Sequence, residues 1–245
     1  MGCRVGSGAR TIACQTASQL CRSNPSVEVL SFFSPGGCSR SGKGLRVVVL
    51  AAHDWGTNAE LIADVAELWL GRGVKTLDPT YGKGTWWKKW RPVNLVTHDI
   101  VIDGVDFRDV PHNDWEFGQV AFDPPYVSIG GRKTSGMKEM HERYGMDLTS
   151  KNPAELQFFI NAGMKECIRV LRPGGVLVMK CQDYVSSGKL FPGTFHTLEH
   201  AINKCGLELV DRFEHIGTPR PQPRRRQQVH ARRNLSTLFV FRKGK

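Results

Sequence analysis

The sequence of 245 residues has seven cysteines, an odd number, and contains no Cys-x-x-Cys pair. Zinc ribbons and dithiol redox sites use that spacing, and a disulfide framework uses an even set of cysteines, so we expect neither a metal nor a disulfide scaffold. Apolar runs near the roughly 20 residues that cross a bilayer are also lacking, and we expect no membrane partner. These absences favour a reducing, cytoplasmic location.

Acidic residues are scarce compared with basic ones. Lys and Arg number 34 against 23 Asp and Glu, which gives a formal net charge of +11 at pH 7. Basic surfaces bind polyanions because neutralised phosphates release their counterions. We therefore expect a nucleic-acid partner, whereas the composition predicts no particular oligomeric state.

The stretch 217–235 has no acidic residue at all, and it connects two apolar runs that read as strands, Leu207–Phe213 and Leu235–Phe241. Charge runs are usually solvated, and Pro-rich ones are usually disordered. Because strands hold both ends here, we interpret the stretch as an Arg-rich loop that clamps a phosphate backbone, with a merely solvated loop as the alternative. Its predicted nucleic-acid-binding residues are Arg220, Arg224, Arg225, Arg226, Arg232 and Arg233.

Residues 1–44 lack an apolar period, are rich in Gly, Ser and Cys, and contain one acid, Glu28. We expect a poorly ordered N-terminal extension, either a flexible leader or an organelle transit peptide. In residues 45–245, apolar strands and amphipathic helices alternate, and 40% of the whole chain is apolar. This region is long enough to form one α/β domain.

The stretch Val120–Tyr126, Val-Ala-Phe-Asp-Pro-Pro-Tyr, reads as a buried strand that ends in a polar turn. Pro124 and Pro125 have a fixed φ and no N–H, so the turn is stiff and its carbonyls point outward. The exocyclic amine of a nucleobase becomes a nucleophile when two acceptors hold its N–H bonds, and Asp123 and a backbone carbonyl can supply them. Tyr126 offers a flat face for stacking the base. An edge strand with a Pro-Pro stop and a surface Tyr is the alternative.

A second polar turn follows the apolar run Val74–Leu77. Asp78 comes first, then Gly82 and Gly84 as a Gly-x-Gly that opens a helix, followed by Thr85. A strand that runs through such a turn into a helix lets the backbone approach a nucleotide closely. The third glycine of the dinucleotide fingerprint is missing, so an ordinary loop remains an alternative.

Two more positions are predicted to contact a nucleotide-like ligand. Asp99 ends the predicted strand Asn94–Asp99, about 20 residues beyond the glycine turn, where Rossmann-like folds hydrogen-bond ribose hydroxyls. Thr57 or Asn58 can cap the predicted amphipathic helix Ala59–Leu70, and Asn58 is our candidate for presenting that helix start to a ligand carboxylate. A residue that only caps the helix is the alternative.

The Asp-Pro-Pro-Tyr turn resembles the motif of the S-adenosylmethionine-dependent amino-methyltransferases, the N6-adenine class above all. Asp78–Thr85 resembles their cofactor-binding turn, Asp-Pro-x-x-Gly-x-Gly-Thr. The resemblance also implies that Asp106 and Phe107 contact the adenine of the cofactor, although a solvated acidic loop with one buried Phe would give the same pattern. The implied fold is a Rossmann-like class I methyltransferase α/β fold. Its seven-stranded sheet is mostly parallel with an antiparallel last strand and helices on both faces.

The resemblance implies methyl transfer from S-adenosylmethionine to an exocyclic amino nitrogen, above all adenine N6 in DNA. The residues with an implied catalytic role are Asp123, Pro124, Pro125 and Tyr126. The implied or predicted cofactor-binding residues are Asn58, Asp78, Gly82, Gly84, Thr85, Asp99, Asp106 and Phe107. The irregular stretch 127–154 is interpreted as a basic substrate flap, with Arg132 and Lys133 as further nucleic-acid-binding residues.

Three other functions remain open. A ribosomal or transfer RNA methyltransferase can use the same turn, so the substrate can be RNA instead of DNA. Relatives that methylate a protein glutamine usually carry Asn where Asp123 stands. A basic, catalytically silent nucleic-acid-binding module with the same fold is an alternative of a different class.

Overall fold

The computed structural model describes residues 50, 52, 55–125, 152–217, 228–231 and 233–245. The predicted N-terminal extension 1–44 and nearly all of the predicted flap 127–154 therefore lie outside the described residues. So do these predicted site residues: Tyr126, Arg132, Lys133, Arg220, Arg224, Arg225, Arg226 and Arg232.

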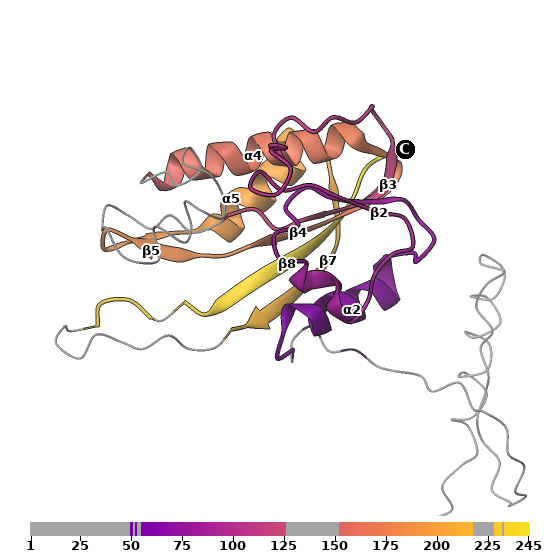
Figure 1. The fold of residues 1–245 in the computed structure, drawn as a ribbon. Helices are drawn as coiled ribbons and strands as arrows, with labels where there is room; N and C mark the ends of the chain where they lie inside the picture. Colours follow the sequence, from indigo (N-terminus) through magenta and orange to yellow (C-terminus); the bar gives the residue numbers. More distant parts are fainter. Residues whose placement is uncertain (1–49, 51, 53–54, 126–151, 218–227, 232) are drawn as a thin grey trace, which may run out of the picture. The chain divides into compact units, whose positions relative to one another are not determined.

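A six-stranded sheet forms the centre of the described domain, with the strand order β2-β1-β3-β4-β8-β7 (Figure 1). The strands are β1 Thr76–Asp78, β2 Leu95–Thr97, β3 Phe117–Phe122, β4 Leu171–Cys181, β7 Glu208–Ile216 and β8 Leu235–Arg242. Strands β1 to β4 pair in parallel. Strand β8 runs antiparallel to both of its neighbours, β4 and β7. This confirms the expected Rossmann-like α/β arrangement, with a sheet that is mostly parallel and has an antiparallel last strand.

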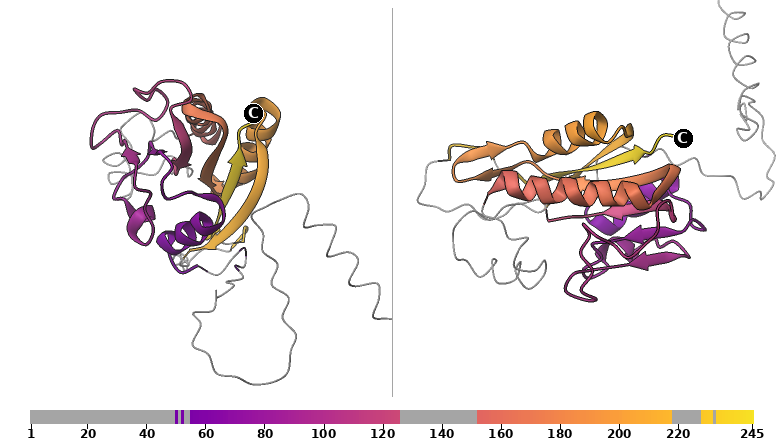
Figure 2. Two further views of the ribbon diagram at one scale, coloured as in Figure 1. Left: turned by 90° about the vertical axis from the view of Figure 1, so that its right-hand side faces the viewer. Right: turned by 90° about the horizontal axis from the view of Figure 1, so that it is seen from above.

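Helices cover both faces of the sheet (Figures 1 and 2). Helix α2 (Asn58–Trp69) and the 3₁₀ helix η1 (Thr85–Lys88) pack on one face, which we call the α2 face. Helix α4 (Pro153–Val170) and helix α5 (Gly193–Glu199), which a short π-helix η3 (His200–Lys204) continues, lie on the other face. The buried residues accordingly form two cores, one on each side of the sheet.

Alternation along β4 shows which side chains reach which core. Leu177 and Met179 belong to the core beneath α4, whereas Val178 belongs to the core beneath α2. Successive side chains of a strand point to opposite faces. The side chain of Lys180, the next residue, therefore leaves the sheet on the α2 face, near the end of the strand.

Seven strands are expected, and the main sheet has six among the described residues. Segment 103–111, which follows β2, forms turns instead of a strand. The carboxylates of Asp103 and Asp106 accept hydrogen bonds from the backbone N–H groups two residues on, Val105 and Arg108. Such local bonds compete with sheet pairing. An unexpected hairpin of β5 (Tyr184–Ser186) and β6 (Lys189–Phe191) forms a separate two-stranded sheet.

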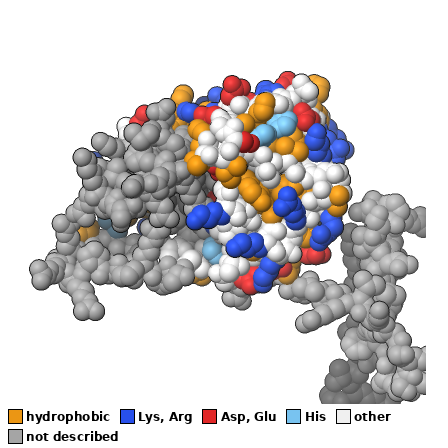
Figure 3. Space-filling model, in the orientation of Figure 1, with side chains coloured by type: hydrophobic (Ala, Val, Ile, Leu, Met, Phe, Trp, Pro, Cys, Tyr) orange, Lys and Arg blue, Asp and Glu red, His pale blue; other side chains and the backbone are white. Residues whose placement is uncertain are grey.

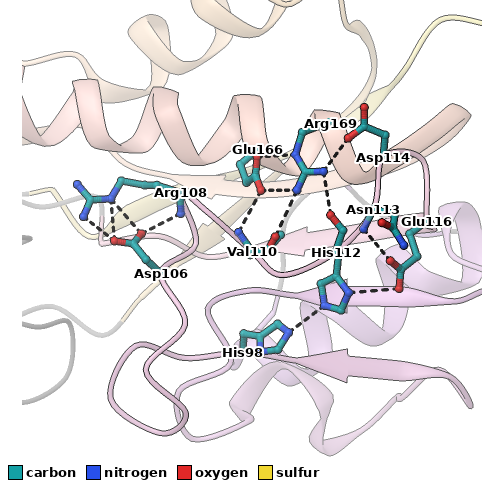
Figure 4. Close-up of polar contacts among 10 residues, drawn as sticks. All are labelled: His98, Asp106, Arg108, Val110, His112, Asn113, Asp114, Glu116, Glu166 and Arg169. Carbon is teal, nitrogen blue, oxygen red and sulfur yellow. Dashed lines mark hydrogen bonds and ion pairs between the residues drawn. The ribbon is translucent and has the colours of Figure 1, made fainter.

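A polar network ties the loop between β2 and β3 to its surroundings (Figure 4). Arg169 of α4 donates to the Glu166 carboxylate at 2.6 Å and to the His112 carbonyl at 2.8 Å. The Nε2 atoms of His98 and His112 lie 2.9 Å apart. Burial lowers the pKa of His112, against the charge of Glu116. These contacts hold the start of the loop, where Asp99 lies, to the body of the domain.

The aromatic and basic run after the glycine turn, residues 86–91, is divided between the core and the surface. Trp86 and Trp87 are buried in the core of the α2 face, while Lys88, Lys89 and Arg91 are exposed. Lysine and arginine side chains are scattered over this side of the molecule (Figure 3). The pattern indicates core tryptophans whose basic neighbours face solvent.

Candidate active site

A small hollow opens where β1, β2 and β3 end. Its lining consists of Asp78, Thr80, Tyr81, Gly82, Thr85, Trp86, Asp99 and Asp123. The structure thus brings together Asp78, Gly82, Thr85, Asp99 and Asp123, which the sequence places up to 45 positions apart (123 − 78). Strand β1 lies between β2 and β3, so the chain reverses its direction across the sheet at this point. Open α/β sheets bind ligands at such switch points, outside the carboxyl ends of the strands.

Asp78 is the most buried acid of this hollow, with 4% of its surface exposed. Its carboxylate accepts hydrogen bonds from Trp87 Nε1 at 2.7 Å and from the backbone N–H of Thr80 at 3.0 Å. Burial raises its pKa to about 7, the negative charge of Asp123 adds to the rise, and the two hydrogen bonds oppose it. Asp78 can therefore exchange a proton near neutral pH.

Thr80 connects Asp78 to the proline turn. Its hydroxyl accepts a hydrogen bond from the backbone N–H of Asp123 at 2.9 Å and lies 3.4 Å from an oxygen of Asp78. Pro124 and Pro125 are buried, so the start of the turn is packed within the fold. Sequence reasoning missed Thr80, although its position two residues after Asp78 is typical of an Asx turn.

The glycine turn has backbone conformations that side chains rarely adopt. Gly82 and Gly84 have φ of 53° and 63°. A Cβ on Gly84 would also lie 2.5 Å from the hydroxyl of Tyr81, whose ring lies against this backbone. Gly84 is buried and stands immediately before η1, although it does not line the hollow itself. Glycine is therefore required here for both shape and space.

Asp99 closes the hollow on the side of β2. One carboxylate oxygen accepts from the backbone N–H of Gly82 at 2.9 Å, and the other accepts from Val101 N–H at the same distance. The acid thereby joins the end of β2 to the glycine turn that follows β1. Asp99 is 8% exposed and lines the hollow.

Trp86 adds a donor that sequence reasoning did not assign to the site. Its indole lines the hollow and is buried, and its Nε1–H has no acceptor among the described residues. Buried polar groups in folded proteins are nearly always hydrogen-bonded, so an unpaired one beside a hollow indicates a place for a ligand acceptor.

Like Gly84, the predicted cofactor contacts Asp106 and Phe107 do not line the hollow. The Asp106 carboxylate pairs with the guanidinium of Arg108, with Nε–Oδ1 at 2.9 Å (Figure 4). Burial would raise the pKa of Asp106, but the hydrogen bonds and charge of Arg108 outweigh it and lower the pKa. Phe107 is buried and packs on Phe122, with ring centroids 5.3 Å apart. The arrangement matches the alternative of an acidic loop with one buried Phe, and the adenine contact stays a prediction.

Asn58 does not cap α2. The cap is Thr57, whose hydroxyl accepts from the N–H of Glu60 while the Glu60 side chain accepts from the N–H of Thr57. Of the two predicted caps, Thr57 and Asn58, the structure thus has Thr57, and the contact of Asn58 with a ligand carboxylate stays a prediction. The Oδ1 atom of Asn58 instead accepts a hydrogen bond from Lys180 Nζ at 2.6 Å.

Of the predicted nucleic-acid-binding residues, Arg233 is the one that the structure describes. It is exposed, and its carbonyl accepts a hydrogen bond from Gln182 Nε2 at 3.2 Å. Within the described ranges, no set of three or more His, Cys, Asp or Glu residues is placed to hold a metal ion. No helix in those ranges has the length and apolar character that a membrane crossing requires.

No protein-family model matches the sequence, and no curated protein matches it. Among solved structures, the chain is similar to the cyclase SpnF, with 15% identity, a TM-score of 0.45, and coverage of 76% of this chain and 80% of that chain. It is similar to 1,6-didemethyltoxoflavin-N1-methyltransferase of Burkholderia thailandensis, with 12% identity, a TM-score of 0.43, and coverage of 77% and 79%. A cytosine-N4-specific PvuII DNA methyltransferase is similar at 16% identity and a TM-score of 0.37, with 54% of this chain and 44% of that chain covered. At such identities and TM-scores, these likenesses assign neither a reaction nor a substrate to this chain.

Proposed function

We propose that this chain transfers a methyl group from S-adenosylmethionine to an exocyclic amino nitrogen of a nucleobase, above all adenine N6 in DNA. The observation that carries the proposal is the convergence of Asp78, Asp99 and Asp123 on one hollow at the switch point of the sheet. Two of these acids come from turns that resemble methyltransferase motifs, and the third stands where ribose hydroxyls are bound in Rossmann-like folds.

The residues around the hollow fit such a cofactor. Carboxylates suit its positive charges, and the Asp99 carboxylate at the end of β2 suits a ribose. The unpaired indole N–H of Trp86 can donate to an acceptor on the ligand. Gly82, which lines the hollow, has no side chain to block close approach of a ligand to the backbone. When bound, S-adenosylmethionine supplies a methyl group on a sulfonium, which leaves as a neutral thioether.

In this proposal Asp123 acts on the amino group of the base. Its carboxylate accepts one N–H bond, and the carbonyl of Pro124 accepts the other, which withdraws the nitrogen lone pair from the ring and directs it at the methyl carbon. The new N–C bond forms as the C–S bond breaks, and the nitrogen then releases one proton to solvent. Positioning and electrostatics supply most of the acceleration, because little proton transfer is needed before the bond forms.

Tyr126, directly after this corner, would stack on the target base. In a duplex the base must first leave the stack, which costs a few kcal/mol. The net charge of +11 and the arginines of the loop 217–235 support a nucleic-acid substrate. Positive charges attract the phosphates of the strand from which the base has been flipped out.

The substrate class is tested with labelled S-adenosylmethionine in parallel incubations with DNA, RNA and cell protein. Label in DNA adenine supports the proposal. Label confined to RNA would assign the chain to RNA N-methylation, and label confined to protein would reject a nucleobase substrate. If calorimetry detects no binding of S-adenosylhomocysteine, the silent nucleic-acid-binding module is the better account.

A further inference from the structure

Lys180 is a buried cation beside the candidate active site. It is 3% exposed and stands near the carboxyl end of β4. Strands β3 and β4 pair in parallel with Phe122 opposite Met179, so the next residues, Asp123 and Lys180, are neighbours at the ends of these strands. Phe122 and Met179 both point into the core beneath α4. Since side chains alternate, Asp123 and Lys180 leave the sheet on the same α2 face.

Asp78 leaves β1 on this face as well. Leu77 points into the core beneath α4, and the Asp78 carboxylate meets Trp87 on the opposite side. The ends of three neighbouring strands thus present Asp78, Asp123 and Lys180 in a row along one face, in that order. Among the lysines that the structure describes, Lys180 alone is buried.

The hydrogen bond from Lys180 fixes the orientation of the side-chain amide of Asn58. Lysine ammonium groups only donate hydrogen bonds, so the oxygen of Asn58 must face Lys180 Nζ, at 2.6 Å. The NH2 group of Asn58 then points away from Lys180 with its donors available. Asn58 is the first residue of α2, beside the Thr57 cap, where helix N–H groups and the helix dipole attract anions.

A buried ammonium is costly for the fold, and an apolar side chain of similar size would be cheaper at this position. Burial lowers the pKa of Lys180, and the negative charge of Asp123 opposes this shift. The other ionisable groups around this corner are Asp78 and Asp99 at the hollow, Cys181 on β4, His215 on β7 and Glu60 on α2. Burial lowers the pKa of His215, and the charge of Lys180 adds to that shift. Among the acids of the hollow, Asp123 is the one whose charge acts on Lys180.

We propose that Lys180 is a positioning residue of the proposed methyl-transfer site: it orients the Asn58 amide toward the carboxylate of the cofactor and places its positive charge beside the Asp123 carboxylate. The inference rests on the proposed function. It assigns Lys180 two separable effects, one through its hydrogen bond and one through its charge.

Two substitutions separate these effects. Lys180→Met removes both the donor and the charge at similar volume. Lys180→Gln removes the charge and keeps a donor for Asn58. We expect Lys180→Met to weaken binding of S-adenosylhomocysteine about tenfold in calorimetry. Asn58→Ala should weaken it by a similar factor, and the double variant should bind no more weakly than either single variant, because both changes remove the same contact.

The pH profile of methyl transfer reports the charge effect. Without the ammonium, Asp123 takes up a proton more readily, so the acidic limb of kcat should move to higher pH by about one unit in both Lys180 variants. Asn58→Ala should leave that limb in place. Lys204→Met, at an exposed lysine of η3, serves as the matched control and should change neither binding nor the limb.

The outcomes distinguish this inference from the proposed function. If the wild type binds S-adenosylhomocysteine but methylates no nucleic acid, the proposed function is rejected, and the binding comparison still decides the role of Lys180. Wild-type affinity together with an unshifted acidic limb in the Lys180 variants would overturn the inference. Thermal unfolding checks that each variant is folded; if Lys180→Met does not fold, the limb of Lys180→Gln decides.

Discussion

The backbone N–H of Asp123 donates a hydrogen bond to the hydroxyl of Thr80 at 2.9 Å. This bond connects the proline turn after β3 to the loop after β1. The same hydroxyl lies 3.4 Å from the Asp78 carboxylate. A single side chain therefore contacts both the acid assigned to the cofactor and the backbone of the acid assigned to the substrate. Catalysis that depends on positioning is sensitive to displacements of about 1 Å at such a link.

Thr80→Val tests this link. Valine has the shape of threonine without the hydroxyl, so the N–H of Asp123 loses its acceptor at a partly buried position. We expect the free energy of unfolding to fall by about 1–3 kcal/mol, and kcat to fall because Asp123 is no longer held in place. Chemical denaturation and steady-state kinetics measure the two effects.

The matched control is Thr97→Val at the end of β2, since the hydroxyl of Thr97 makes no hydrogen bond with another described residue. It should change both quantities little. If Thr80→Val and Thr97→Val behave alike, Thr80 does not set the geometry of the turn.

Gly84→Ala tests the glycine turn. Gly84 has φ of +63°, and an added Cβ would collide with the Tyr81 ring. The left-handed backbone alone costs an L-residue about 1–2 kcal/mol, and the collision adds to it. We expect a lower melting temperature and weaker binding of S-adenosylhomocysteine.

Gly73→Ala is the control for this change, because a Cβ there meets nothing within 4 Å and its φ is not left-handed. It should leave the melting temperature unchanged or raise it slightly, through the smaller conformational entropy of the unfolded chain. Equal melting temperatures of the two alanine variants would contradict the account of the turn.

The raised pKa of Asp78 predicts a pH dependence of cofactor binding. Burial raises the pKa of Asp78 to about 7, so below pH 7 most molecules carry a proton on this carboxylate. A cationic ligand favours the ionised carboxylate, so binding must expel that proton at low pH. Affinity for S-adenosylmethionine should therefore rise with pH, by up to about tenfold per unit below pH 7, and level off above it.

Calorimetry at pH 6 in two buffers of different ionisation enthalpy measures the released proton directly. Asp123→Asn removes a like charge, so it should lower the pKa of Asp78 and move this dependence to lower pH. Proton release that is the same at pH 6 and pH 8 would be inconsistent with the assignment to Asp78.

Strong local patterns made much of this fold predictable. The periodic apolar positions indicated α2 within one residue of its observed ends, and the apolar runs located β3 and β8. The turn motifs named five residues that the hollow brings together. Both successes depend on signals that lie within a few residues of one another along the chain.

The remaining features depend on contacts between distant residues. Thr80 and Trp86 join the site only because the loops after β1 and β3 meet, and nothing in their local sequence marks that meeting. Asp106 is the acid that the resemblance implies for the cofactor, but its carboxylate pairs with Arg108, two residues away. The pairing of Lys180 with Asn58 spans 122 positions, and no sequence pattern indicated it.

The Arg-rich loop is tested by replacing Arg224, Arg225 and Arg226 together with alanine. If these side chains contact phosphates, nucleic-acid binding should weaken and the slope of log K against log salt should become shallower by about three units. A triple alanine variant at the exposed lysines Lys165, Lys204 and Lys245 removes the same charge and should keep the slope nearer to that of the wild type. An unchanged slope in the arginine variant would show that the loop takes no part in binding.

The most direct test of methyl transfer at this corner compares the wild type with Asp123→Ala. Both are incubated with labelled S-adenosylmethionine and DNA, and the nucleosides are separated after digestion. We predict label in N6-methyladenine for the wild type, a loss of about a hundredfold or more for Asp123→Ala, and affinity for S-adenosylhomocysteine within a few fold. Undiminished transfer by Asp123→Ala would contradict the account.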